Sequence, residues 1–106
     1  MGKPLDPKVD HRIALTTAVA QARKFRGGGA IRAGDSGAFN AAPVQALLAQ
    51  KGCVGMRYYL GRDERGEPNM ILVGVNAKGN NMSDGIVLDG VFPCPPYCPD
   101  PDELHK

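Results

Sequence analysis

The chain has 106 residues and a formal net charge of +2, since 13 Lys and Arg residues stand against 11 Asp and Glu residues. This length suits one domain with a modest core, and the small charge argues against nucleic acid or an anionic membrane as a partner. No apolar run follows Met1 that would make a signal peptide, and no stretch is long enough to span a bilayer. We therefore expect a cytoplasmic protein whose thiols stay reduced.

The first predicted element is a helix from Pro7 to Arg26. Asp6 stands at its N-cap, and a proline fits the first turn because the N–H that it lacks has no partner there. Apolar residues at helical spacing form two stripes, and the second is either a tolerated exposure or a contact with another chain. The first stripe is Leu15, Ala18, Val19, Ala22 and Phe25, and the second, our candidate interface, is Val9, Ile13 and Ala20.

A glycine-rich loop follows this helix, because the three glycines at 27–29 are unfavourable in a helix interior. The segment RGGGAIRAGDSG, residues 26–37, places Gly29 and Gly34 at the spacing of a phosphate-binding loop. Asp35 occupies the position where such a loop has its lysine, and the segment follows a helix rather than a strand. We therefore interpret it as a hinge loop and not as a nucleotide site.

A second helix is predicted after Asn40, which serves as its cap, with Pro43 in the first turn. Its apolar face is formed by Val44, Leu47 and Leu48. Lys51 adds a cation where the helix dipole favours one, and Gly52 can adopt the left-handed conformation that ends a helix.

Three strands are expected after this helix, because the apolar period changes to two at Cys53. They are Cys53 to Leu60, Met70 to Val75 and Gly85 to Leu88, separated by polar turns at 62–68 and 76–81. The fold class is therefore α+β, with two N-terminal helices followed by a three-stranded antiparallel meander. Since three strands are few, we expect a further edge partner from the tail or from another subunit.

The chain is interpreted as a single domain over 1–106. Residues 1–37 provide a helix and the glycine-rich loop, 38–92 provide a helix and the β-meander, and 93–106 form a tail. The prolines and cysteines of this tail predict an extended, stiff segment rather than a folded one.

The sequence offers no activated nucleophile, so we expect no enzyme. Cys53 follows the end of a predicted helix, where the dipole disfavours a thiolate. Ser36 lies beside Asp35, but no nucleophile elbow surrounds it.

Two cysteines in the segment PCPPYCP, residues 93–99, carry the strongest chemical signal. Cys94 and Cys98 are separated by a spacer that zinc ligands use, and His105 or Cys53 could add a further ligand. No second closely spaced pair is present, and an odd number of cysteines counts against a disulfide framework. Three alternatives therefore remain: a zinc site, a disulfide between Cys94 and Cys98, or two reduced thiols packed on the sheet. Zinc is the only cofactor that these residues suggest.

Four segments resemble a set of short uncharacterised bacterial proteins. They are AFN at 38–40, GCVGMRYYLGR at 52–62, ILVGVNAKGNNMSDGIVLDG at 71–90 and PCPPYC at 93–98. The resemblance covers about residues 37 to 98 and leaves out the first helix. It implies a bacterial source and a small intact module, and it implies no reaction.

Together these features predict a small, non-enzymatic interaction or assembly protein that associates with itself or joins a larger complex. Its partner would be protein rather than nucleic acid or membrane. The alternative is a small zinc-binding domain that uses Cys94 and Cys98 with Cys53 or His105.

Overall fold

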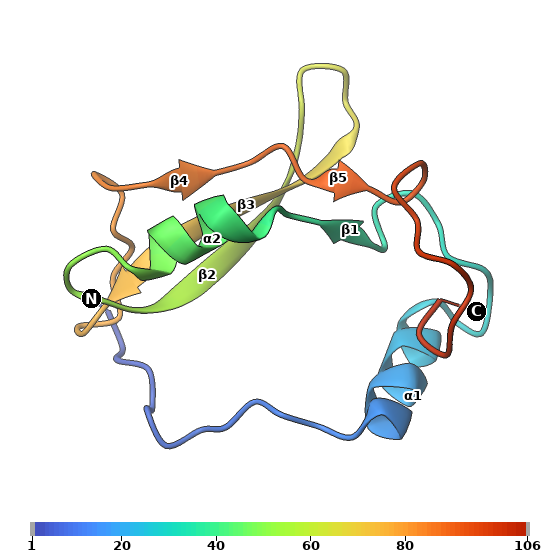
Figure 1. Ribbon diagram of the computed structural model, residues 1–106, viewed down its shortest axis with the longest axis horizontal. Coiled ribbons are helices and arrows are strands. Elements are labelled where there is room, and N and C mark those ends of the chain that lie inside the picture. Colours follow the sequence, from blue (N-terminus) through green and yellow to red (C-terminus); the bar gives the residue numbers. More distant parts are fainter. Residues whose placement is uncertain (1, 106) are drawn as a thin grey trace.

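A computed structural model describes residues 2–105 and shows an α+β fold with two helices and a three-stranded antiparallel sheet, as the sequence predicts (Figure 1). A small two-stranded sheet accompanies them. The elements in chain order are α1 (Leu15–Phe25), β1 (Gly37–Ala38), α2 (Ala41–Leu48), β2 (Cys53–Arg62), β3 (Pro68–Asn76), β4 (Val87–Leu88) and β5 (Phe92–Pro93).

The larger sheet has the strand order β2-β3-β4, so β2 is one of its edges. The long hairpin of β2 and β3 pairs from Arg62 opposite Pro68 to Cys53 opposite Asn76, with an irregularity between Cys53 and Gly55. The third strand is shorter than expected, because only Val87 and Leu88 pair with β3. The meander predicted from the period of two is thus confirmed, with a minimal third strand.

Strands β1 and β5 form the second sheet, which the sequence did not indicate. Gly37 lies opposite Pro93, and Ala38 lies opposite Phe92. Each strand has two residues, too few for a period of two to be recognised. This pairing joins the loop after α1 to the start of the cysteine segment.

Helix α1 begins at Leu15, so the predicted start at Pro7 is wrong. Two aspartates before the helix bind the backbone locally. The Lys8 N–H donates to Asp6 Oδ1 at 2.9 Å, and the Arg12 N–H donates to Asp10 Oδ1 at 3.2 Å. Such Asx turns compete with helical hydrogen bonds and hold this segment outside the helix.

The expected second stripe does not exist as a helical face, because Val9 and Ile13 precede α1 and only Ala20 lies within it. Both side chains are exposed, by 52% and 56% respectively, and no residue of α1 is buried. A role of these three residues in an interface stays a prediction.

The buried apolar residues are Leu47 on α2, Leu72, Val73 and Val75 on β3, and Cys94 after β5. Strand β3 is covered on both faces, because the successive residues Leu72 and Val73 point to opposite sides of the sheet and both are buried. Leu47 is fully buried on α2, which lies across the sheet in Figure 1. The second helix begins after Asn40 as predicted, although the Asn40 side chain makes no cap hydrogen bond. Gly52 has φ +86°, but α2 ends at Leu48 with Ala49 as its C-cap, so this left-handed residue belongs to the turn before β2 and not, as predicted, to the end of the helix.

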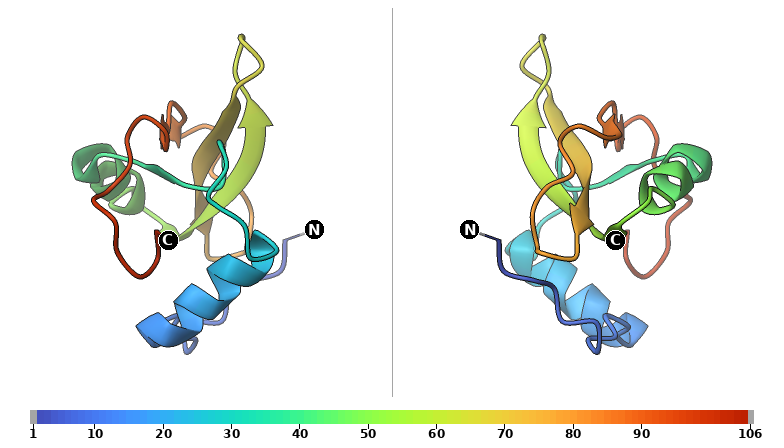
Figure 2. Two further views of the ribbon diagram at one scale, coloured as in Figure 1. Left: turned by 90° about the vertical axis from the view of Figure 1, so that its right-hand side faces the viewer. Right: turned by 90° about the vertical axis from the view of Figure 1, so that its left-hand side faces the viewer.

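The molecule is more open than a compact domain of its size. Its accessible surface is 8136 Å², whereas a compact monomer of this mass exposes roughly 5,700 Å². Its radius of gyration is 15.5 Å, against about 13 Å for a compact chain of this length. Figures 1 and 2 show the reason, since α1 and the segment that leads into it stand away from the sheet. Only the first residues of the chain, around Lys3 and Leu5, lie against Gly79 and Gly55.

The extended tail that the prolines predicted is not confirmed, because turns follow β5 at residues 94–96. The chain then folds back towards the end of α1 (Figure 1). No helix within residues 2–105 has both the length and the apolar character needed to cross a membrane.

Candidate metal and disulfide site

The site begins at Cys94, directly after β5. The Cys94 N–H donates to the Ser36 carbonyl at 3.1 Å, which extends the pairing of β1 with β5 by one bond. The Cys94 residue is only 1% exposed. The first sulfur of the site is therefore fixed to the body of the molecule and shielded from water.

Cys94 and Cys98 are joined by a disulfide, and their Cα atoms are 4.7 Å apart. The Tyr97 N–H donates to the Pro93 carbonyl at 2.9 Å, and the rings of Phe92 and Tyr97 lie 4.8 Å apart. The peptide bonds before Pro95 and Pro96 are cis. The expectation of two reduced thiols is therefore wrong for this state, because the loop closes on itself and brings the two sulfurs together.

His105 approaches the same sulfurs from the end of the chain. Asp102 Oδ1 accepts hydrogen bonds of 2.9 Å from the N–H groups of Leu104 and His105. This turn directs the imidazole towards the disulfide, and Nε2 lies 3.6 Å from Cys94 Sγ. The ligand atoms of Cys94, Cys98 and His105 all lie within 4.8 Å of one another, so the group could hold a metal ion.

The distance between Cys94 Sγ and His105 Nε2 suits a tetrahedral metal, whereas the two cysteine sulfurs are bonded to each other and would first have to separate. Zinc–sulfur bonds of about 2.3 Å and zinc–nitrogen bonds of about 2.0 Å place neighbouring ligand atoms roughly 3.6 Å apart. The distance between Cys94 Sγ and His105 Nε2 has this value without a metal. Cys98 is exposed and His105 is half-buried, so the group is open to solvent on one side.

A cavity of about 310 Å³ lies beside His105, between the end of α1 and the folded-back tail. Its wall includes Ala22, Arg26, Ile31, Asp35, Ser36, Pro99, Asp102, Leu104 and His105. The cavity gives small solutes a path to the imidazole side of the site.

Cys53 does not join the group. It is a half-buried free thiol at the start of β2, and its Sγ lies 3.2 Å from the Gly55 carbonyl. Of the four ligands that the sequence suggested, the structure therefore brings together Cys94, Cys98 and His105 and leaves Cys53 outside.

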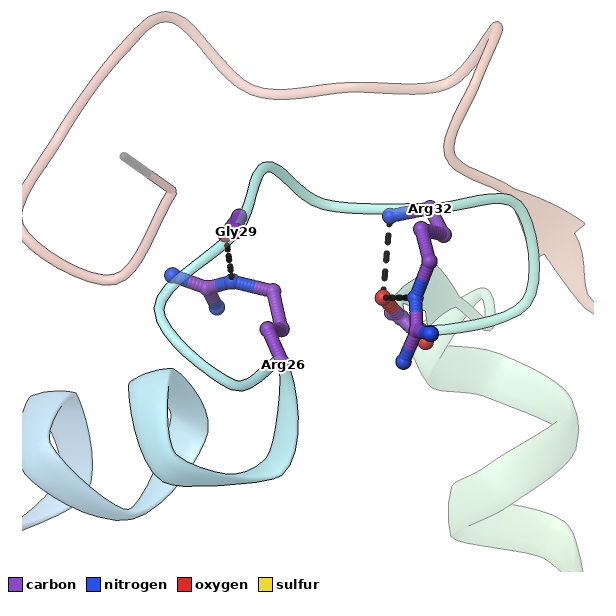
Figure 3. Close-up of polar contacts among 4 residues, drawn as sticks. Arg26, Gly29 and Arg32 are labelled. Atoms are coloured by element: carbon purple, nitrogen blue, oxygen red, sulfur yellow. Dashed lines mark hydrogen bonds and ion pairs between the residues drawn. The ribbon is translucent and has the colours of Figure 1, made fainter.

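The glycine-rich loop uses its charges internally. Arg26 folds back so that its Nε donates to the Gly29 carbonyl at 3.1 Å (Figure 3). Asp35 Oδ2 accepts from the Arg32 N–H at 2.9 Å and from Arg32 Nε at 3.2 Å. The backbone hydrogen bond from Arg32 lowers the pKa of Asp35 below its ordinary value of 3.8, although desolvation opposes the shift and the Arg32 guanidinium adds to it. The Asp35 carboxylate is thus held by hydrogen bonds from a residue of its own loop.

The sequence identified the three side chains that could hold a metal ion, but it did not indicate what positions them. The pairing of β1 with β5 had no sequence signal. The turn at Asp102 did have a sequence signal. An aspartate commonly accepts hydrogen bonds from the N–H groups two and three residues later, which here belong to Leu104 and His105. No protein-family model, curated protein or solved structure matches the chain, so the chemistry of the site rests on its geometry.

Proposed function

We propose that this protein is a small zinc-binding module, in which Cys94, Cys98 and His105 hold the ion after the disulfide has been reduced. The observation that supports the proposal is the distance of 3.6 Å between Cys94 Sγ and His105 Nε2, which a tetrahedral zinc requires of two neighbouring ligands. Two thiolates and one imidazole are the donors that zinc prefers in proteins.

Reduction has to precede binding, because a disulfide sulfur is a poor metal ligand. A thiol reductant supplies two electrons and two protons, the S–S bond breaks, and Cys94 and Cys98 become thiols. Zinc then displaces the two thiol protons and binds the thiolates. The disulfide and the metal centre are therefore alternative states of the same two sulfurs.

Three protein ligands leave one tetrahedral position to water or to an outside donor atom. Cys53 lies apart from the group, so the described residues offer no third sulfur at this position. A partner protein could supply the missing ligand. A zinc-dependent contact of this kind would connect the site to the interaction role that the sequence suggested.

The test is a zinc titration of the full chain in its reduced and oxidised states. We expect stoichiometric binding with proton release for the reduced chain, and none for the chain with its disulfide intact. His105→Ala should weaken binding by about 100-fold or more, because even partners outside the ligand shell contribute roughly 10- to 100-fold.

His11→Ala and Cys53→Ser serve as matched controls, since both residues lie outside the group. Equal weakening by His11→Ala and His105→Ala would contradict the proposed ligand set, as would zinc binding that ignores the redox state of the two cysteines.

A second function, that of an interaction or assembly protein, is favoured by the apolar side chains at the N-terminal end. Val9 and Ile13 are more than half exposed, and Phe25 is 72% exposed at the end of α1. Burying such side chains would contribute about 25 cal/mol of favourable free energy for each Å² of apolar surface removed from water. A contact with another protein would recover part of this free energy.

A further inference from the structure

The two sulfurs of the disulfide between Cys94 and Cys98 lie in different surroundings. Cys94 is 1% exposed and its N–H is bound to the Ser36 carbonyl, whereas Cys98 is exposed. A thiolate breaks a disulfide by direct attack on one of the two sulfur atoms, so access helps to decide which atom is attacked. An incoming thiolate can therefore reach Cys98 Sγ, and Cys94 Sγ is the sulfur that has to leave.

The leaving sulfur already faces a hydrogen-bond donor. His105 Nε2 lies 3.6 Å from Cys94 Sγ. A disulfide sulfur carries no proton, so in this contact Nε2 holds the hydrogen and donates it to the sulfur. The same N–H would form a stronger, charge-assisted hydrogen bond once Cys94 leaves as a thiolate. His105 therefore stabilises the developing thiolate more than the starting disulfide, and this difference is what speeds a reaction step.

The backbone keeps the two cysteines close together without help from the S–S bond. The Tyr97 N–H donates to the Pro93 carbonyl, and the Cys98 N–H donates to the Pro96 carbonyl, both at 2.9 Å. A Cys94 thiolate therefore stays beside Cys98 after the disulfide opens. Its attack on Cys98 would expel a monothiol, because an intramolecular reaction between held groups outpaces one with a free molecule. Only a substrate with a second thiol can complete the reaction.

We infer that the oxidised chain passes its disulfide to a dithiol, with Cys98 as the attacked sulfur and His105 as the catalytic residue at the leaving sulfur. One substrate thiolate attacks Cys98 Sγ, the S–S bond breaks, and its electron pair goes to Cys94. The second substrate thiolate attacks the substrate sulfur of this mixed disulfide, and Cys98 leaves with the electron pair. The substrate loses two electrons and becomes a disulfide, and its two protons pass through water to Cys94 and Cys98.

This activity goes beyond the proposed zinc site, because it belongs to the oxidised state and needs no metal. Its product is the reduced cysteine pair that zinc would bind. The protein supplies an electrophilic sulfur here, so the lack of an activated nucleophile in the sequence does not argue against the reaction. Asp102 acts as a positioning residue, since its Oδ1 accepts the His105 N–H at 2.9 Å and thereby orders the turn that carries the imidazole.

The test measures disulfide transfer from the oxidised full chain in the presence of a chelator, with Cys53→Ser removing the free thiol. The probes are dithiothreitol and a synthetic peptide with two cysteines, and their relative rates show whether a small or a peptide dithiol is preferred. With a slight excess of dithiothreitol we expect about one equivalent of oxidised probe for each chain. Acid quenching traps the mixed disulfide, and peptide mass spectrometry should locate it on Cys98.

Three variants test the role of the imidazole. His105→Ala should slow the transfer by roughly 10-fold, the scale of one hydrogen bond to a charged atom. His11→Ala is the matched control and should leave the rate unchanged, since His11 lies outside the group. His105→Gln keeps an N–H donor of similar reach and should retain most of the rate. Circular dichroism checks that each variant keeps its fold.

A mixed disulfide located on Cys94 would overturn the inference, because the buried sulfur would then be the one attacked. An unchanged or faster transfer by His105→Ala would overturn it as well, since the imidazole would then only cover the sulfur. A His105→Gln variant as slow as His105→Ala would do the same. These reactions contain no zinc, so their failure and the failure of the zinc titration are independent results.

Discussion

His105, near the end of the chain, and Asp35, in the glycine-rich loop, show how single side chains are held in place by local hydrogen bonds to the backbone. Asp102 orders the turn that carries His105, and the Arg32 N–H fixes Asp35. In both cases a carboxylate accepts from N–H groups close by in sequence, so the geometry depends on the charge of that carboxylate. Both residues also line the cavity of about 310 Å³.

The lowered pKa of Asp35 leads to a pH prediction. A carboxyl group whose folded pKa is depressed contributes stability above its unfolded value, near 3.8, and loses that contribution as the pH falls through the lower folded value. We expect the contact between Arg32 and Asp35 to persist at pH 4 and to open in stronger acid. Carbon-detected NMR titration of the Asp35 carboxyl measures this directly.

Asp35→Asn provides the control, because it should abolish the acid transition of the Arg32 amide signal. A midpoint for the Asp35 carboxyl at or above 3.8 would show that the loop does not hold it as the structure indicates.

At the scale of the element, β2 and β3 were predictable because ten and nine residues carry a clear apolar pattern. The start of α1 was not, since the Asx turns of Asp6 and Asp10 depend on backbone geometry and not on apolar spacing. The two-residue strands β1 and β5 pair through tertiary contact alone. For the site, the spacing of Cys94 and Cys98 was informative, but it could not decide between a disulfide and a metal.

Helix α2 offers a test of the core. Leu47 is fully buried, whereas its neighbour Leu48 is 46% exposed. Leu47→Ala should lower the free energy of unfolding by about 2–5 kcal/mol through lost burial and a cavity, and Leu48→Ala should cost much less. Urea unfolding measures both, and equal losses would contradict the placement of α2 on the sheet.

The segment before α1 carries the test of the second function. Val9→Asp combined with Ile13→Asp places two charges among exposed apolar side chains and should release a partner without unfolding the chain. Light scattering measures the mass of the assembly. As a control, Lys8→Asp changes charge in the same segment without removing an apolar side chain. If the assembly keeps its mass after the double substitution, Val9 and Ile13 have no role in the interface.

At the scale of the whole molecule, the open shape and the two states of the cysteine pair belong to one account. The start of the tail is connected to the body by the hydrogen bond from the Cys94 N–H to the Ser36 carbonyl. The end of the tail is connected to this point by the contact between His105 Nε2 and Cys94 Sγ. In the oxidised state the disulfide joins Cys94 to Cys98. In the reduced state zinc would join the same two cysteines and His105. The tail should therefore stay in place in both states, whereas only the reduced, metal-bound state would present an open coordination position to a partner.

The identity of the zinc ligands is the central claim, and X-ray absorption at the zinc edge of the reduced, stoichiometrically loaded chain tests it most directly. We expect two sulfur atoms at about 2.3 Å, one imidazole nitrogen at about 2.0 Å and one further light atom. A shell of oxygen and nitrogen alone would contradict the account, as would three sulfur atoms in the shell of the monomeric chain.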